Sequence, residues 1–272
     1  MTTPHSTVSN ARKERRSLRA LSALALVAAL AGSSGGVVTS AAVDRAPVQQ
    51  DPTVRRTYLL GYSVEHRPIV AWLIAPKRTW RSMLIVGSVA GDEPGGITVT
   101  QQLAAEPAIR GLKLWLIPDG NPDGAALGTR VNADGVDLNR NFPSGWRHQG
   151  KRGNRHYSGP RPASEPETRA IEAFLKRIHP QLAVWLHQPY GVIDASEGPG
   201  WAEQQLARAL KLPLEQLRDY PGSAIGYDNH LVPASAFDVE LPGNLSPTDI
   251  QRAAAAIRVL AQRFAADPSD VH

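Results

Sequence analysis

The chain has 272 residues, no cysteine and a formal net charge of +5 at neutral pH. The absence of cysteine excludes thiol catalysis and disulfide bonds, so the hydrophobic core must hold the folded protein together. Most of the net positive charge comes from residues 1–42, which contain five Lys/Arg and one Glu; without them the formal charge falls from +5 to +1. This balance gives little support for a nucleic-acid partner.

Residues 1–42 have the features of a signal peptide. A basic region, residues 11–20, precedes an apolar stretch, Leu21–Gly32, which is shorter than the roughly 20 residues needed to cross a bilayer. The small residues Ser40–Ala42 fit a signal-peptidase site. An uncleaved anchor is the alternative. We expect an exported protein, secreted or associated with the cell envelope, that has no stable membrane insertion once the leader is removed.

A polar linker, residues 43–56, and one domain, residues 57–268, are predicted to follow the leader. Short apolar runs bounded by turn residues indicate strands that are buried on both faces. These runs are residues 69–74, 82–89, 112–118, 182–188 and 236–241.

Helical patterns lie between and after these runs. In residues 164–178 the apolar residues follow the spacing of one buried face, and Ser164 with Glu167 predicts a capping box at the start. Ser246-Pro247 predicts the start of a C-terminal helix, in which Ile257, Leu260, Ala261 and Phe264 repeat the apolar stripe. The alternation predicts an α/β fold, a single domain with a mixed, largely parallel central sheet and helices on both faces.

The segment Asp119–Pro162 interrupts this alternation. It is rich in Gly, Asn, Asp, Arg and Pro and has few apolar residues. A loop of this length inside a domain is either disordered or functional. We favour a functional loop, because so many polar side chains require partners if they are ordered.

Polar residues also stand at the predicted strand ends, where ligands bind in open α/β sheets. Glu93 follows one strand, His187 ends another, and Glu240 lies inside a third. A carboxylate and an imidazole can hold a divalent cation, and a second carboxylate can act as a base. Taken singly, Glu93 could cap the next helix and His187 could be structural. Glu240 needs a partner, because an ionised carboxylate in a buried strand is costly.

Five segments together resemble the zinc carboxypeptidase family, and most closely its bacterial murein peptide amidase branch. They are VAGDEPGG, NPDGAALGTRVNADGVDLNRNFP, YSGPRPASEPET, VWLHQPYG and FDVELP, and the resemblance spans residues 58 to about 265. Within them GVDLNRNFP is the most specific. The resemblance implies the fold of that family and one bound zinc ion.

The resemblance also implies a role for each matching residue. Glu93 and His187 match the second and third zinc ligands, and Glu240 matches the general base. Asn139 and Arg140 match the pair that holds a substrate carboxylate, and Arg130 matches the arginine that stabilises the oxyanion. Asp137 matches the acid that orients the first zinc-bound histidine. Tyr220 and Tyr227 are both candidates for the family's tyrosine near the substrate amide.

The chain departs from the family at the first zinc ligand, where Ala90 replaces histidine. A catalytic zinc uses three protein ligands and a water, and alanine has no donor atom. Asp92 is a poor substitute, since adjacent side chains on an extended segment point apart. The histidines in predicted loops could each supply the missing ligand by moving in. They are His66, His148, His156 and His230.

Two functions therefore remain open. The first is an exported hydrolase that cleaves an amide bond near a free carboxylate in a peptide or muropeptide. The second is a catalytically silent module that binds carboxylate-terminated peptides without zinc. A serine nucleophile elbow and a nucleotide-binding loop have little support. GxSxG occurs only at residues 32–36, within the predicted leader, the GxxxxGK at residues 145–151 is followed by Arg152 rather than by Ser or Thr, and GxGxxG is absent from the sequence.

Overall fold

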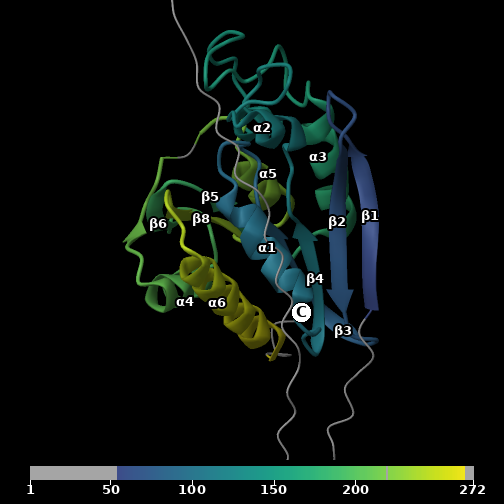
Figure 1. Ribbon diagram of the computed structural model, residues 1–272, viewed down its shortest axis with the longest axis vertical. Helices are drawn as coiled ribbons and strands as arrows, with labels where there is room; N and C mark the ends of the chain where they lie inside the picture. The colour runs from purple at the N-terminus through teal and green to yellow at the C-terminus, as the bar shows by residue number, and fades with distance from the viewer. Residues whose placement is uncertain (1–53, 219, 267–272) are drawn as a thin grey trace, which may run out of the picture. The chain divides into compact units, whose positions relative to one another are not determined.

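The computed structural model describes residues 54–218 and 220–266, and the predicted signal peptide lies outside them (Figure 1). In these residues eight strands form one sheet in the order β1-β2-β4-β3-β5-β8-β6-β7. Their bounds are β1 Val54–Tyr62, β2 Pro68–Ala75, β3 Thr79–Val86, β4 Gly111–Ile117, β5 Leu182–His187, β6 Tyr190–Asp194, β7 Leu214–Glu215 and β8 Ala236–Pro242.

The centre of the sheet is parallel. Strands β4, β3, β5 and β8 run in the same direction, whereas β1 with β2, β2 with β4, and β6 with β8 pair antiparallel. The sheet is thus mixed with a parallel centre, as the sequence predicted. Because the central strands are parallel, β3, β5 and β8 all end at the same edge of the sheet, where polar loops can meet.

Helices cover both faces of the sheet, again as predicted (Figure 1). Helices α1, α4 and α6 contribute to one apolar cluster and α3 and α5 to the other. Their bounds are α1 Gly95–Ala105, α2 Pro122–Leu127, α3 Pro166–Ile178, α4 Trp201–Leu210, α5 Ala224–Leu231 and α6 Pro247–Ala266, with a short 3-10 helix η1 at Leu138–Arg140. Among the described residues no helix is both long and apolar enough to cross a bilayer.

Two boundaries differ from the prediction. Strand β1 begins at Val54, inside the predicted linker, because it pairs along its length with β2. The side chain of Arg55 also donates to the carbonyl oxygen of Glu106 at 2.7 Å. The predicted strand 82–89 ends early, at Val86. There the chain turns so tightly that a Cβ on Gly96 would lie 1.8 Å from the carbonyl oxygen of Gly87.

The predicted capping box at the start of α3 is wrong. Helix α3 has Glu165 as its N-cap, with no side-chain cap. Glu167 instead accepts hydrogen bonds from the backbone of Val64 at 3.2 Å and from Asn132 at 3.1 Å, so distant donors replace the local one. The cap at Ser246 is confirmed, because its hydroxyl oxygen accepts from the Asp249 amide at 3.2 Å.

Candidate functional site

The predicted site residues meet at the edge where β3, β5 and β8 end. His187 is the last residue of β5 and lies opposite Glu240 of β8 in the parallel register. Glu93 reaches them from the turn between β3 and α1, and its Oε2 lies 2.9 Å from Nδ1 of His187. The structure therefore brings Glu93 and His187 into direct contact, with Glu240 on the neighbouring strand.

Close backbone packing fixes the turn that carries Glu93. A Cβ on Gly91 would lie 2.0 Å from the carbonyl carbon of Gly124 in α2, so only glycine allows this approach. The amide of Glu93 donates to the carbonyl oxygen of Ala90 at 3.0 Å. Helix α1 has Pro94 at its N-cap without a side-chain cap, so Glu93 does not cap it. The Glu93 carboxylate is directed to the site instead.

Ala90 offers no ligand to that site. Its side chain is fully buried, and its carbonyl oxygen accepts from the Ser88 hydroxyl at 2.7 Å as well as from Glu93. The adjacent Asp92 does not replace the missing donor, because its Oδ2 lies 2.6 Å from Nη1 of Arg155. Among the described residues no group of three His, Cys, Asp or Glu side chains is arranged to hold a metal ion.

Arg130 lies between two buried carboxylates. Its Nη1 is 2.7 Å from Oε1 of Glu93, and its Nε is 2.8 Å from Oδ2 of Asp137. Burial disfavours the charged guanidinium, but Asp137 and Glu93 more than offset it and raise the pKa of Arg130 above its ordinary value. Arg130, which the resemblance assigns to an oxyanion, therefore forms ion pairs with two acids in this structure.

Asp137 has partners other than the family's first histidine. Besides Arg130, its Oδ2 contacts Nδ1 of His156 at 3.1 Å, and its Oδ1 accepts from the Asn139 amide at 3.1 Å. Burial opposes ionisation, yet His156 and Arg130 hold the pKa of Asp137 below its ordinary value. Of the four candidate loop histidines, His156 is thus the one in contact with a site residue, and that residue is Asp137 rather than Glu93.

The other candidate histidines have different surroundings. The amide of His66 donates to the carbonyl oxygen of Ser63 at 3.0 Å in a turn. The ring of His148 lies between the aromatic rings of Trp146 and Tyr157. His230, in α5, belongs to none of the contacts around Glu93.

His187 is buried between acids. Its Nδ1 faces Glu93, and its Nε2 lies 3.4 Å from Oδ1 of Asp238. Burial lowers the pKa of this imidazole, but Asp238 and Glu93 outweigh that effect and raise it to about 9. The acids on both sides of His187 thus favour its protonated form, and a metal would have to displace that proton in order to bind the imidazole.

Asp238 is a site residue that the sequence prediction missed. Burial raises its pKa to about 7, although His187 acts to lower it. Alternation along a strand gives the available signal, because residues two apart share one face, and Asp238 precedes Glu240 by two. The prediction missed Gln188 as well, whose backbone amide donates to Oε2 of Glu93 at 3.2 Å.

Glu240 has an unsatisfied carboxylate oxygen. The residue is 8% exposed, and its Oε2 has no hydrogen-bond partner among the described residues. Burial raises the pKa of Glu240, and the nearby Glu93 adds to that rise, whereas His187 opposes it. A buried acceptor of this kind is costly unless a ligand or water donates to it.

Asn139 and Arg140 form a rigid pair at η1. The side chain of Asn139 accepts from the Ala224 amide at 2.8 Å, and Nη1 of Arg140 donates to the Asn139 carbonyl oxygen at 2.6 Å. The Arg140 guanidinium lies over the ring of Tyr220, 3.9 Å from its centroid. Tyr227, by contrast, is buried and donates to Glu172 at 3.2 Å. Only Tyr220 of the two candidate tyrosines therefore contacts the pair.

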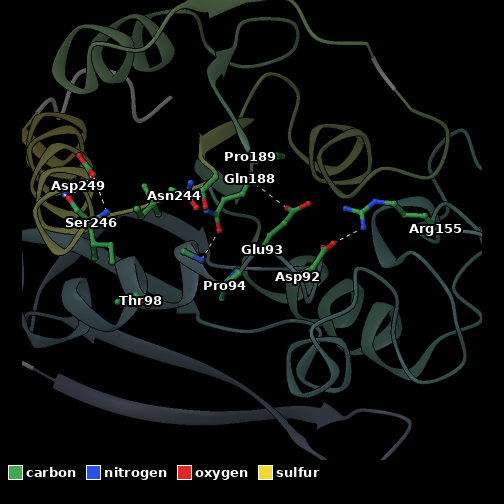
Figure 2. A pocket seen from close by; sticks show the side chains of 14 residues that line it. Asp92, Glu93, Pro94, Thr98, Arg155, Gln188, Pro189, Asn244, Ser246 and Asp249 are labelled. Atoms are coloured by element: carbon green, nitrogen blue, oxygen red, sulfur yellow. Dashed lines mark hydrogen bonds and ion pairs between the residues drawn. The ribbon is translucent and has the colours of Figure 1, made fainter.

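A cleft of about 720 Å³ opens beside Glu93. Figure 2 shows its lining, with Glu93 directed toward Gln188 and Asp92 directed toward Arg155. The opposite wall comes from the loop after β8 and the start of α6, including Asn244, Ser246 and Asp249. Polar and apolar residues both line the cleft, which is large enough for a small peptide.

Comparison with known proteins agrees with this architecture. A family model described as zinc carboxypeptidase matches residues 44–193. Murein peptide amidase A of Escherichia coli K12 is 37% identical over 181 residues, which cover 60% of this chain and 72% of that protein. The corresponding protein of Vibrio campbellii is 31% identical over 177 residues, covering 60% and 70%.

Solved structures show the same fold. The murein-tripeptide amidase MpaA from Escherichia coli O157 superposes with a TM-score of 0.64 and 28% identity, covering 83% of this chain and 98% of that one. Carboxypeptidase A of Helicoverpa armigera, at 18% identity, has a TM-score of 0.71 and covers 80% and 70%. On the family match, the shared fold and the identity to these amidases, this chain belongs to the zinc carboxypeptidase family.

Proposed function

We propose that this protein is an exported module that binds peptides ending in a free carboxylate, of the muropeptide type, without using zinc. The family implies a zinc ion, but the residues present do not fit one. Glu93 and His187 are the two remaining ligands, Ala90 has no donor, and Arg130 bonds one oxygen of Glu93. This Glu93–Arg130 contact is the observation that carries the proposal.

Arg140 is the expected anchor for the ligand's carboxylate. One of its N–H groups is bonded to the Asn139 carbonyl, and the ring of Tyr220 supports its flat face. In the described part of the chain the remaining N–H groups have no hydrogen-bond partner, and a guanidinium fork matches a carboxylate well. Glu240 would accept a hydrogen bond from an N–H group of the same ligand, which would satisfy its unpaired oxygen.

The second candidate is hydrolysis of an amide bond in such ligands. The unpaired carboxylate of Glu240 favours it, since a buried acceptor can act as a general base. Relatives named murein peptide amidase support the same ligand class for both candidates. The two functions differ in whether the protein carries a stoichiometric metal and turns the ligand over.

Calorimetry with a murein tripeptide and its C-terminal amide tests the binding proposal. We expect the free acid to bind about tenfold tighter or more, because charge-assisted hydrogen bonds contribute about 1.5–3 kcal/mol. Arg140→Gln should abolish this preference. Arg110→Gln, an exposed arginine next to the opposite end of β4, is the matched control and should keep it.

The same preparation decides between binding and hydrolysis. Elemental analysis should find no stoichiometric zinc, and chromatography should find the tripeptide intact after long incubation. Stoichiometric zinc together with product release would establish the hydrolase and eliminate the silent module. Equal affinity for acid and amide would remove the assigned role of Arg140.

A further inference from the structure

The buried contacts around Glu93 leave it no free oxygen. Oε1 bonds Nη1 of Arg130 at 2.7 Å, and Oε2 lies 2.9 Å from Nδ1 of His187 and 3.2 Å from the Gln188 amide. The side chains of Glu93 and Arg130 are only 5% and 11% exposed. A cation that enters this centre must therefore displace a partner that Glu93 already has.

Arg130 connects Glu93 to a second buried acid. Its Nε bonds Oδ2 of Asp137 at 2.8 Å, and the Asp137 side chain is fully buried. Two ionised carboxylates in a buried centre are stable only with a paired cation. The guanidinium suits this task better than an ammonium group, because separate nitrogens on a rigid fork can bond the two acids at once.

The position of Ala90 explains why this cation is needed. The resemblance to the zinc carboxypeptidase family implies that Glu93 would face a metal and that Asp137 would face a histidine at position 90. The buried methyl group of Ala90 provides neither the imidazole nor a metal ligand. Without Arg130, the ion pairs left would be that of Glu93 with His187 and that of Asp137 with His156.

We infer that Arg130 is the built-in cation of this centre, taking over the counter-charge that a divalent metal supplies elsewhere in the family. The inference rests on the proposed zinc-free function. If only the missing histidine prevented zinc binding, restoring it would be sufficient; the role inferred for Arg130 predicts a different result. Restoring histidine at position 90 is insufficient for tight zinc binding, because Arg130 competes with the metal for Glu93.

Zinc titrations against a chromophoric chelator test this competition in the full chain. The variants are Ala90→His, Ala90→His with Arg130→Gln, and Ala90→His with Arg67→Gln. Arg67 is the matched control, since its Nη1 bonds the buried carboxylate of Asp123 at 2.6 Å, outside the centre. We expect the Arg130→Gln double variant to bind zinc roughly tenfold tighter or more than Ala90→His alone, and the control to stay within about twofold.

Arg130→Gln removes the partner of two buried acids and could prevent folding. Ala90→His with Arg130→Lys keeps a positive charge but loses the two-armed contact, so its zinc affinity should lie above that of Ala90→His alone. Thermal melts with and without zinc give a second measurement, in which the zinc-dependent rise in Tm should follow the same order.

Equal zinc affinity in Ala90→His and in both Arg130 variants would overturn the inference, because Arg130 would then not compete with the metal. The peptide-binding proposal fails differently, through zinc and turnover in the unmodified protein or through loss of the preference for a free carboxylate. Stoichiometric zinc in the unmodified protein would overturn both ideas, whereas equal affinity for acid and amide would remove only the peptide-binding proposal, so the two failures are distinguishable.

Discussion

Ala90 offers no donor, and the polar side chains near the site pair with one another. Asp137 bonds Arg130 and His156. His187 lies between two acids, Asp238 and Glu93, which raise the pKa of its imidazole to about 9 although burial lowers it. At this scale the site contains several buried ion pairs, while Arg140 has no ion pair and one oxygen of Glu240 has no hydrogen-bond partner among the described residues.

Asp228, outside the site, gives a pH prediction at the same scale. Its Oδ2 accepts from Nε1 of Trp185 at 3.1 Å, and burial raises its pKa to about 7 although that hydrogen bond lowers it. The folded pKa is above the unfolded value of about 4. The stabilisation from its proton is therefore complete below about pH 4 and is lost as the pH rises through 7.

Asp228→Asn keeps the acceptor for Trp185 and removes the titration. Relative to the unmodified protein, the variant should gain free energy of unfolding between pH 4 and 8, by up to about 4 kcal/mol. Urea unfolding at several pH values measures this gain. Asp134→Asn, the same change at an exposed acid, is the matched surface control. An unchanged pH dependence in Asp228→Asn would contradict the expected titration.

Strands and helices have distinct tasks in this protein. The parallel strands β3, β5 and β8 bring their carboxyl ends to one edge, which gathers residues from distant parts of the sequence. Helix α6 covers one face of the sheet, with Ile257, Leu260 and Phe264 buried as the periodicity predicted. The apolar stripe of α6 therefore supports the sheet that carries the site, whereas the first turn of this helix borders the cleft.

Two neighbouring positions of α6 test this division. Leu260→Ala should lower the free energy of unfolding by about 2–5 kcal/mol, since Leu260 is fully buried and its removal leaves a cavity. Val259→Ala is the control, because Val259 is 56% exposed and should change stability by about 0.5 kcal/mol or less. Comparable losses in urea unfolding of the two variants would show that α6 does not pack as described.

The central sheet joins both apolar clusters of the described domain. Along β3, Met83 and Ile85 belong to one cluster while Leu84 and Val86 belong to the other, because successive side chains point to opposite faces. Neither cluster can lose its packing while the shared strands remain ordered. The domain should therefore unfold as one cooperative unit.

Coincident unfolding curves test this cooperativity in the whole protein. Tryptophan fluorescence, with Trp185 fully buried in the cluster that α3 and α5 share, and far-ultraviolet circular dichroism should give the same midpoint in urea. Leu260→Ala should shift both midpoints equally. Two separated transitions would mean that the two sides of the sheet unfold independently.

The fold class was accessible from the sequence because it depends on local patterns, and the resemblance to a family supplied the candidate site residues. Apolar runs and helical stripes reflect burial, and motifs such as GVDLNRNFP and VWLHQ place Asn139, Arg140 and His187 at predicted loop and strand ends. The predicted capping box at Ser164 is wrong because a local pattern does not include partners from distant parts of the chain. Glu167 found distant partners that a local pattern does not contain.

The sequence by itself determined an α/β domain with Glu93, His187 and Glu240 at one sheet edge and no ligand at position 90. Only the tertiary structure decided that Arg130 bonds Glu93 and Asp137, that His156 contacts Asp137, and that Asp238 faces His187. These contacts join residues far apart along the chain. Their partners are chosen by distance and by the cost of burying an unpaired charge, and neither is encoded in local periodicity.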